Sequence, residues 1–178
     1  LLGVSITASL STTYEKRGDH KFHIALQTRD FSKSISCKLE KGTRTREEEE
    51  ELVTAFVVNL LAECSELAYD YPKIPEEVVF DEVKAEKGWA ELMSNKINYV
   101  LSEDASPELI FPGAFYPYHD GHKAMKDLAE QETGKKIYFE ICIQNVDKPP
   151  ISYHQIKKTV MQFNDSENWV LTKAGKFS

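Results

Sequence analysis

The sequence predicts an α/β protein in which strands and helices alternate along the chain. Short segments with continuous or alternating apolar residues, typical of strands, recur throughout. Segments with helical spacing and capping signals lie between several of them. Hydrophobic residues make up 41% of the 178 residues, which is enough for a packed core.

Three strands and one helix are predicted in the first part of the chain. The strands cover residues 4–10, 20–28 and 34–39. A helix begins after Thr45, because Thr45 and Glu48 have the spacing of a capping box. Its apolar residues follow 3.6-residue spacing: Leu52, Val53, Phe56, Val57, Leu60, Leu61 and Cys64.

Two ionisable features of this part have ordinary explanations. The glutamates at 47–51 fall in the first turns of the predicted helix, where the macrodipole favours negative charge, and we expect a solvated helix face. His20 and His23 lie on opposite faces of one predicted strand, so they do not pair. We expect these histidines at the surface, with no part in catalysis.

A charged connector is expected after the helix. Residues 69–86 contain Pro72, Pro75 and many charges, without clear periodicity. Residues 88–96 can form a short helix, and 97–101 a strand.

In the last part of the chain, from residue 108 onward, the pattern predicts a strand, a helix, a strand, a helix and a strand. The expected elements are a strand at 109–111, a helix at 119–131 that ends at Gly134, a strand at 136–143, a helix opened by a capping box of Ser152 and Gln155, and a strand at 169–171. This order implies right-handed crossovers and a parallel sheet.

Charge and composition exclude several classes of function. A net charge of −7 argues against nucleic-acid partners, which need a basic surface. The chain has no apolar run of membrane-spanning length and no secretory signal, so no membrane partner is expected. Cys37, Cys64 and Cys142 lack metal-site spacing, and we expect reduced thiols in a cytoplasmic protein without a protein-held metal. Because the chain starts at Leu1 instead of Met, we expect a piece of a longer protein.

The clearest chemical signal is residues 111–122, with the sequence FPGAFYPYHDGH. The segment lies between a predicted strand and a predicted helix, at the edge where open α/β sheets bind ligands. Gly113 allows a tight turn. His119 and His122 open the helix, whose free N–H groups favour an anion, and Gly121 leaves room for a phosphate.

Histidines placed in this way can donate hydrogen bonds to phosphate oxygens. These bonds help most as charge develops on a transferred nucleotidyl group and on departing pyrophosphate, so no protein nucleophile is required. Mg²⁺ is expected on the phosphates. Surface or capping histidines are the plain alternative, but the whole string between a strand and a helix is more specific than two histidines.

Residues 113–122 resemble the signature of the HxGH nucleotidylyltransferases, which join a nucleoside triphosphate to a small phosphate or nucleotide. Residues 138–150 (YFEICIQNVDKPP) are similar to the second strand and loop of the cytidylyltransferase-like branch, which includes relatives of nicotinamide-nucleotide adenylyltransferase. This resemblance covers residues 108–178. Residues 3–61 resemble, more weakly, the second half of the C-terminal domain of CinA, the nicotinamide-nucleotide amidase fold.

The resemblance implies a partial CinA-like α/β layer at 1–68, a connector at 69–106, and the N-terminal half of a Rossmann-like parallel-sheet nucleotidylyltransferase domain at 107–178. It implies transfer of an adenylyl or cytidylyl group from a nucleoside triphosphate to a small phosphorylated acceptor, with release of pyrophosphate. Nicotinamide or nicotinate mononucleotide is one candidate acceptor. The resemblance is also compatible with a homo-oligomer whose interface lies in the CinA-like part.

The same resemblance assigns roles to individual residues. His119 and His122 are the expected catalytic residues, which stabilise the phosphates. The expected nucleotide-binding residues are Gly113, Ala114, Phe115, Gly121 and Lys148. Asp147 either caps a turn or contacts the ligand, and Lys123 and Lys126 could supply further positive charge.

Several departures leave other hypotheses open. Ala114 stands where the family usually has Ser or Thr, and Tyr116 where it has Asn or Asp. The arginines Arg17, Arg29, Arg44 and Arg46 all precede the HxGH motif, and the later Ser/Thr-rich motif with its arginine is missing. We therefore expect this chain alone to be a poor catalyst, and a degenerate nucleotide-binding or scaffold protein is the second hypothesis. A third is an amidase, for which only Thr7 matches an active-site position.

Overall fold

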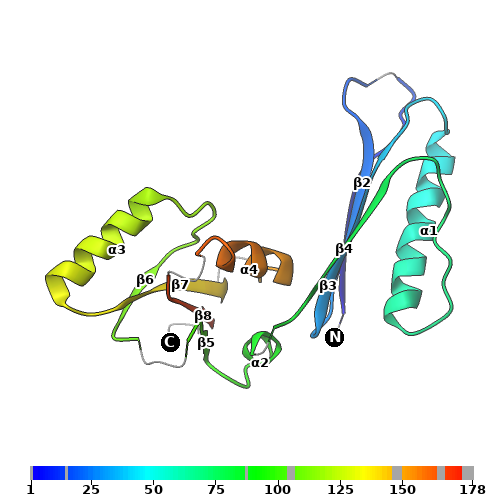
Figure 1. Cartoon of the computed structure of the whole chain (residues 1–178). Helices are drawn as coiled ribbons and strands as arrows, with labels where there is room; N and C mark the ends of the chain where they lie inside the picture. Colours follow the sequence, from blue (N-terminus) through cyan, green and yellow to red (C-terminus); the bar gives the residue numbers. More distant parts are fainter. Residues whose placement is uncertain are drawn as a thin grey trace. The chain divides into compact units, whose positions relative to one another are not determined.

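The computed structural model of the chain describes residues 2–14, 16–86, 88–103, 107–145, 150–163 and 167–173. The chain divides into two compact units (Figure 1). The first comprises Leu1–Thr28 and Lys33–Glu82, and the second comprises Arg29–Ser32 and Val83–Ser178. The α/β class is confirmed, because the described part of the first unit combines a sheet with one helix and that of the second combines a sheet with several.

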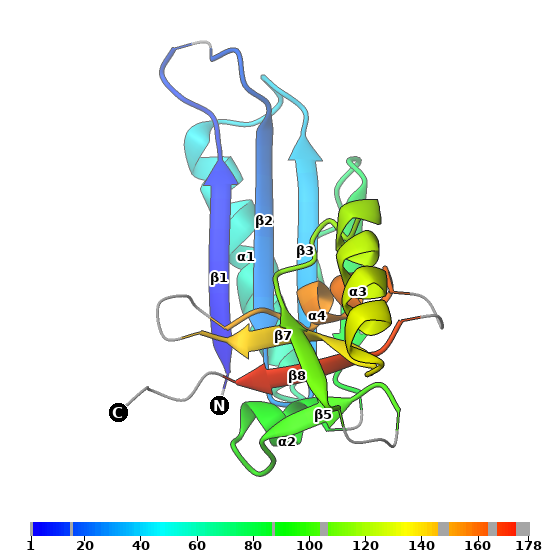
Figure 2. The same ribbon diagram turned by 90° about the vertical axis from the view of Figure 1, so that its left-hand side faces the viewer.

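The first unit is a sheet covered on one face by a long helix. Its strands, in the order β1-β2-β3-β4, are β1 (Gly3–Ser9), β2 (His20–Gln27), β3 (Phe31–Leu39) and β4 (Val78–Lys84). Strands β1 and β2 are antiparallel, with Gly3 opposite Gln27 and Ser9 opposite Lys21. Helix α1 (Arg46–Cys64) runs along one face of this sheet, as both views show (Figures 1 and 2).

Apolar side chains join the helix to the sheet. On β2 every second residue is buried, beginning with His20, and the buried side chains of α1 include Val53, Phe56 and Leu60. The rings of Phe22 and Phe56 lie 5.2 Å apart. The predicted capping box is confirmed: the hydroxyl of Thr45 accepts from the N–H of Glu48, and the carboxylate of Glu48 accepts from the N–H of Thr45.

Two expectations about ionisable residues are wrong. Glu49 belongs to the acidic run expected to be solvated, yet it is fully buried, and His20 is buried as well. Nδ1 of His20 lies 2.8 Å from Oε1 of Glu49, and the N–H of Ser11 donates to Oε2 of Glu49 at 2.6 Å. A buried carboxylate needs such partners, and a tertiary pairing of this kind leaves no local signal in the sequence.

The region expected to be a connector contains an ordered strand. Residues 78–84 form β4, which completes the first sheet at the side of β3. The segment before β4 is tied down by Arg44, whose Nη2 donates to Oε2 of Glu76 at 2.9 Å. Hydrogen bonding to Arg44 lowers the pKa of Glu76 to about 2, although partial burial opposes this. The pair therefore stays ionised near neutral pH.

The second unit is built on a mixed sheet with the order β5-β8-β7-β6. The strands are β5 (Tyr99–Leu101), β6 (Leu109–Pro112), β7 (Ile137–Gln144) and β8 (Trp169–Lys173), and the helices are α2 (Trp89–Met93), α3 (Asp120–Thr133) and α4 (Tyr153–Val160). Strands β6, β7 and β8 are parallel, as the strand–helix order predicts. Strand β5 instead pairs antiparallel with β8 at one edge.

An aromatic cluster forms the core of the second unit. Phe139 on β7 is completely buried, and its ring stacks on Phe163 with centroids 5.1 Å apart and planes 2° apart. Rings from Phe111, Phe115 and Tyr118 surround the same side chain. The loop after β6 is thus packed onto β7, one of the two central strands of the sheet.

We predict that Phe139→Ala destabilises the second unit by about 3–5 kcal/mol, because it empties the centre of this cluster. Both tryptophans, Trp89 and Trp169, lie in that unit, so tryptophan fluorescence during denaturant unfolding measures the effect. Tyr99→Ala is the control: it removes an aromatic ring that is 57% exposed, and should cost no more than about 0.5 kcal/mol. Equal effects of the two substitutions would contradict the described core.

Candidate functional site

The candidate site is the turn between β6 and α3. Strand β6 ends at Pro112, residues 113–119 form the turn, and α3 begins at Asp120. The N–H of Gly113 donates to the carbonyl of Glu140 on β7 at 3.1 Å, which attaches the start of the turn to the sheet. The turn therefore leaves the carboxyl end of a parallel strand and enters a helix N-terminus, the arrangement expected from the sequence.

Phe115 anchors this turn in the core. Its side chain is buried, although its backbone has a positive φ of 49°. A Cβ atom on Gly113 would lie only 2.6 Å from Cζ of Phe115, so a glycine is needed where the ring folds back. The ring of Phe115 therefore faces the protein interior, and its expected part in nucleotide binding stays a prediction that concerns its backbone alone.

Gln162, two residues after the end of α4, holds the same turn. Its Nε2 donates to the carbonyl of Phe115 at 3.2 Å, and its Oε1 accepts from the N–H of Tyr118 at 2.9 Å. One side chain thus satisfies two backbone groups of the turn. Sequence reasoning missed Gln162, since nothing in the local pattern links it to a turn 44 residues earlier.

The two predicted histidines meet at the start of α3. His119 is the N-cap residue, and His122 is the third residue of the helix. Their rings stack with centroids 3.8 Å apart and planes 23° apart. A Cβ atom on Gly121 would lie 3.1 Å from Nδ1 and Cε1 of His119. Gly121 therefore makes room for the ring of His119 at the helix N-terminus.

Hydrogen bonding and burial set the state of His122. Its Nδ1 accepts from the N–H of His119 at 3.3 Å, so in the neutral ring the proton is on Nε2. Partial burial lowers the pKa of His122, and the neighbouring His119 lowers it further. At neutral pH His122 is then an uncharged ring whose Nε2–H is available as a donor.

The lysines near the turn differ in availability. Lys126 is buried, with Nζ 2.9 Å from Oε2 of Glu130 and 3.2 Å from Oε2 of Glu167. Burial disfavours its charged form, but these two carboxylates outweigh burial and raise its pKa. Lys123 is more exposed, and its Nζ lies 3.5 Å from Asp127 and 3.7 Å from Glu167. Only Lys123 of these two is therefore placed to contact a ligand.

Glu167 is a second residue that sequence reasoning missed. It is buried, and its Oε1 accepts from the hydroxyl of Tyr118 at 3.0 Å. Burial and the carboxylate of Glu167 together raise the pKa of Tyr118. The ring of Tyr118 is in turn nearly parallel to that of His122, with centroids 5.8 Å apart. Glu167 therefore positions Tyr118 by a hydrogen bond, and the ring of Tyr118 packs beside that of His122.

The remaining predicted residues fall into two groups. Gly113, Ala114 and Gly121 are exposed at the surface of the turn and the first helical turn. Lys148 and Asp147 lie outside the described residues, so their expected roles stay predictions. Thr7, the position that matches the amidase, is on β1 in the first unit, opposite His23.

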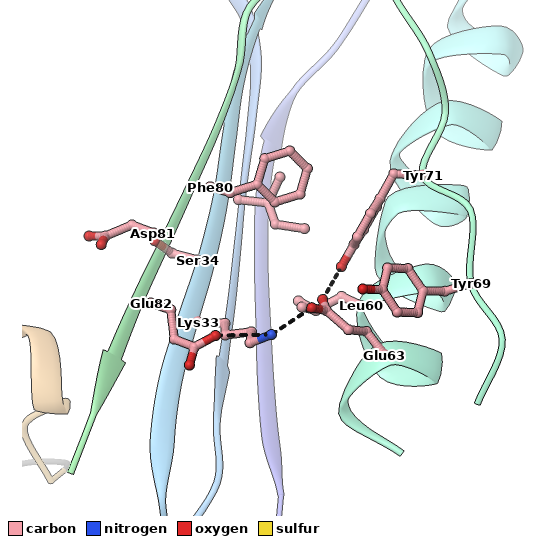
Figure 3. A pocket seen from close by; sticks show the side chains of 10 residues that line it. Lys33, Ser34, Leu60, Glu63, Tyr69, Tyr71, Phe80, Asp81 and Glu82 are labelled. Atoms are coloured by element: carbon pink, nitrogen blue, oxygen red, sulfur yellow. Dashed lines mark hydrogen bonds and ion pairs between the residues drawn. The ribbon is translucent and has the colours of Figure 1, made fainter. Parts of the chain in front are cut away.

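A cavity in the first unit has the wrong charge for a phosphate (Figure 3). It has a volume of about 360 Å³ and lies between strands β3 and β4 on one side and the end of α1 on the other. The ammonium of Lys33 is shared by Glu63 at 2.7 Å and Glu82 at 3.1 Å. Tyr71 also donates to Glu63, at 2.8 Å. Of the residues that line the cavity, only Lys33 carries a positive charge, and two carboxylates already neutralise it, which disfavours an anion.

Neither metal sites nor membrane spans are found in the part of the chain that the structure describes. No group of at least three His, Cys, Asp or Glu side chains is arranged to hold a metal ion among the described residues. Within the same residues, no helix combines the length and the apolar character needed to cross a membrane.

Comparison of the chain with protein-family models, with curated proteins and with solved structures finds no significant match. The chemistry proposed for the site therefore rests on its own geometry. That geometry consists of a stacked histidine pair at a helix N-terminus, after a parallel strand, on a turn fixed by Phe115 and Gln162.

We predict that Gly113→Ala destabilises the second unit by about 1–3 kcal/mol, since the added methyl group would meet the ring of Phe115. The cost should largely disappear in a Phe115→Leu background, where the ring is gone. A double-mutant cycle followed by tryptophan fluorescence measures this coupling. Additive effects of the two substitutions would show that the ring does not pack against Gly113.

Proposed function

We propose that the turn between β6 and α3 binds the phosphates of a nucleoside triphosphate, and that the intact protein is a nucleotidylyltransferase. The transferred group would be adenylyl or cytidylyl, and the acceptor a small phosphorylated molecule such as nicotinamide or nicotinate mononucleotide. The observation that carries the proposal is the stacked pair His119 and His122 on the first turn of α3, directly after a parallel strand.

The donors at this turn suit an anion. The N–H groups of Asp120 and Gly121 precede the first backbone hydrogen bond of α3, which the N–H of His122 donates to the carbonyl of His119 at 2.9 Å. The helix dipole adds positive potential at the same place. Nε2–H of His122 adds a side-chain donor, and Lys123 lies one residue further along the helix. Ala114 and Gly121 bring no bulky side chain to the surface where phosphate oxygens would approach.

In the proposed reaction a phosphate oxygen of the acceptor attacks the α-phosphorus of the triphosphate. The bond from that phosphorus to the oxygen bridging to the β-phosphate breaks, and pyrophosphate leaves with the electron pair. Negative charge then grows on the oxygens of both products. His119 and His122, held in place before the ligand arrives, would stabilise this charge without moving.

Mg²⁺ fits this proposal as a partner of the nucleotide. The described residues offer no cluster that would hold the ion by themselves, so the phosphate oxygens would be its main ligands. When bound, Mg²⁺ neutralises charge on the phosphates. A triphosphate substrate also agrees with the cytoplasmic location that we expect.

A second candidate is a nucleotide-binding protein without turnover. Ala114 is exposed on the turn and offers no hydroxyl group, and the side chain of Tyr116 is 65% exposed where the resemblance has a small polar residue. These two positions weaken the donor set without closing the site. Experiments must therefore distinguish a protein that binds the nucleotide and turns it over from one that only binds it.

We predict that ATP·Mg²⁺ or CTP·Mg²⁺ binds the chain and that the His119→Ala, His122→Ala double variant binds at least about tenfold more weakly, since a hydrogen bond to a charged group contributes about 1.5 kcal/mol or more. Calorimetric titration measures both. His23→Ala, which removes an exposed histidine of the first unit, is the matched control and should bind normally. Unchanged affinity in the folded double variant would refute a phosphate site at this turn.

Acceptor-dependent release of pyrophosphate separates the two candidates. The transferase predicts release only when a phosphorylated acceptor is present, and loss of that release in the double variant. If nucleotide binding is lost in the double variant, and the intact protein releases no pyrophosphate from the triphosphate with any acceptor, the non-catalytic candidate is favoured.

A further inference from the structure

Strand β1 is an edge strand with an exposed apolar face. Among the described residues it pairs with β2 alone, at one end of the sheet order. All of its residues except Ser9 are exposed, although Val4 and Ile6 are large apolar side chains. Leu2, directly before the strand, is 40% exposed as well.

This apolar face continues the core of the first unit. Val4 lies opposite Leu26, Ile6 opposite Ile24, and Ala8 opposite Phe22. The three residues of β2 in these pairs are buried, whereas their partners on β1 are not. Directly opposite residues share one face of a sheet, so the face that is buried at β2 becomes exposed at β1.

The other strand edges in the described part of the chain are protected in ways that β1 is not. Strand β4 carries Asp81, Glu82 and Lys84, while β5 has three residues and β6 has four and ends in a proline. Charges, short length and proline all discourage pairing with another chain. Strand β1, with the sequence GVSITAS, has seven residues and none of these features.

We propose that β1 pairs antiparallel with β1 of a second copy of this chain, about a two-fold axis at Ile6. This register uses the whole strand: Ile6 lies opposite Ile6 of the other copy, Val4 opposite Ala8, Ser5 opposite Thr7, and Gly3 opposite Ser9. The two four-stranded sheets then form one continuous sheet across the dimer.

The strand is complementary to itself in this register. Val4, Ile6 and Ala8 from both copies form one apolar strip, and the hydroxyl groups of Ser5 and Thr7 face each other on the opposite side. No charged residue of β1 opposes another, which matters for two chains that each carry a net charge of −7. If the register were shifted by one residue, Val4 and Ile6 would lie opposite residues that carry hydroxyl groups.

The assembly closes at two copies. An antiparallel pair of identical strands has two-fold symmetry, and each β1 is consumed by it. The outer edge of the combined sheet is β4 in both copies, where Asp81, Glu82 and Lys84 oppose further pairing. A discrete dimer is therefore expected, and not a fibre. This inference is independent of the proposed function, because β1 belongs to the first unit.

Sedimentation and light scattering of the purified chain test the dimer. The expected mass is twice the 20.3 kDa of one chain, and the dimer should strengthen with added salt, which screens repulsion between two negatively charged copies. Ile6→Lys places two ammonium groups opposite each other and should raise the dimer dissociation constant at least about tenfold. Val79→Lys introduces the same charge at a similarly exposed β-branched residue on β4, so it is the matched control and should remain dimeric.

Cross-linking tests the register. With copper phenanthroline as oxidant, Ile6→Cys should form a disulfide-linked dimer, because the axis brings position 6 of both copies together. Wild-type protein and Val79→Cys should not cross-link under the same conditions. A monomeric wild-type chain, a dimer that Ile6→Lys leaves intact, or equal cross-linking of Ile6→Cys and Val79→Cys would each overturn the proposal.

Discussion

The candidate site depends on the burial of one ring, that of Phe115. The turn after β6 reverses so tightly that Phe115 adopts a positive φ, and its side chain enters the aromatic cluster around Phe139. From there the ring also contacts His122, with centroids 5.1 Å apart. The histidine pair is thus positioned by hydrophobic packing from within the core. Donors fixed in this way need no rearrangement when charge develops on a ligand.

Carboxylates outnumber ammonium groups around the site, where Lys123 and Lys126 lie among Asp127, Glu130 and Glu167. Glu167 is buried beside the turn and is neutralised mainly by Lys126, which is itself buried. That pairing withdraws one lysine from the ligand surface and leaves Lys123, the helix N-terminus and the neutral His122. For the phosphate site that we propose, such a donor set would favour a ligand whose own charge is partly neutralised, as a nucleotide with Mg²⁺ is. It is less suited to a bare polyanion, in keeping with the overall charge of −7.

The sequence predicts local features well and tertiary pairings poorly. Capping boxes at Thr45 and Ser152 and the glycine that ends α3 are confirmed, because each depends on neighbours within a few residues. The meeting of the two histidines is also local, since a helix brings residues three apart together. Gln162 and Glu167 act across more than forty residues, so no spacing rule could reveal them. For the same reason the sequence did not predict the pairing of Glu49 with His20 or strand β4 within the charged connector.

Titration of the histidines by NMR, with and without ATP·Mg²⁺, tests the central claim most directly. In the free protein the pKa of His122 should lie below 6.5, since burial and the neighbouring His119 both disfavour its charged form. A bound phosphate favours that charged form, so saturation with nucleotide should move the midpoint of His122 to higher pH. Nucleotide binding that leaves the titration of His122 unchanged would place the phosphates elsewhere and contradict a phosphate site at this turn.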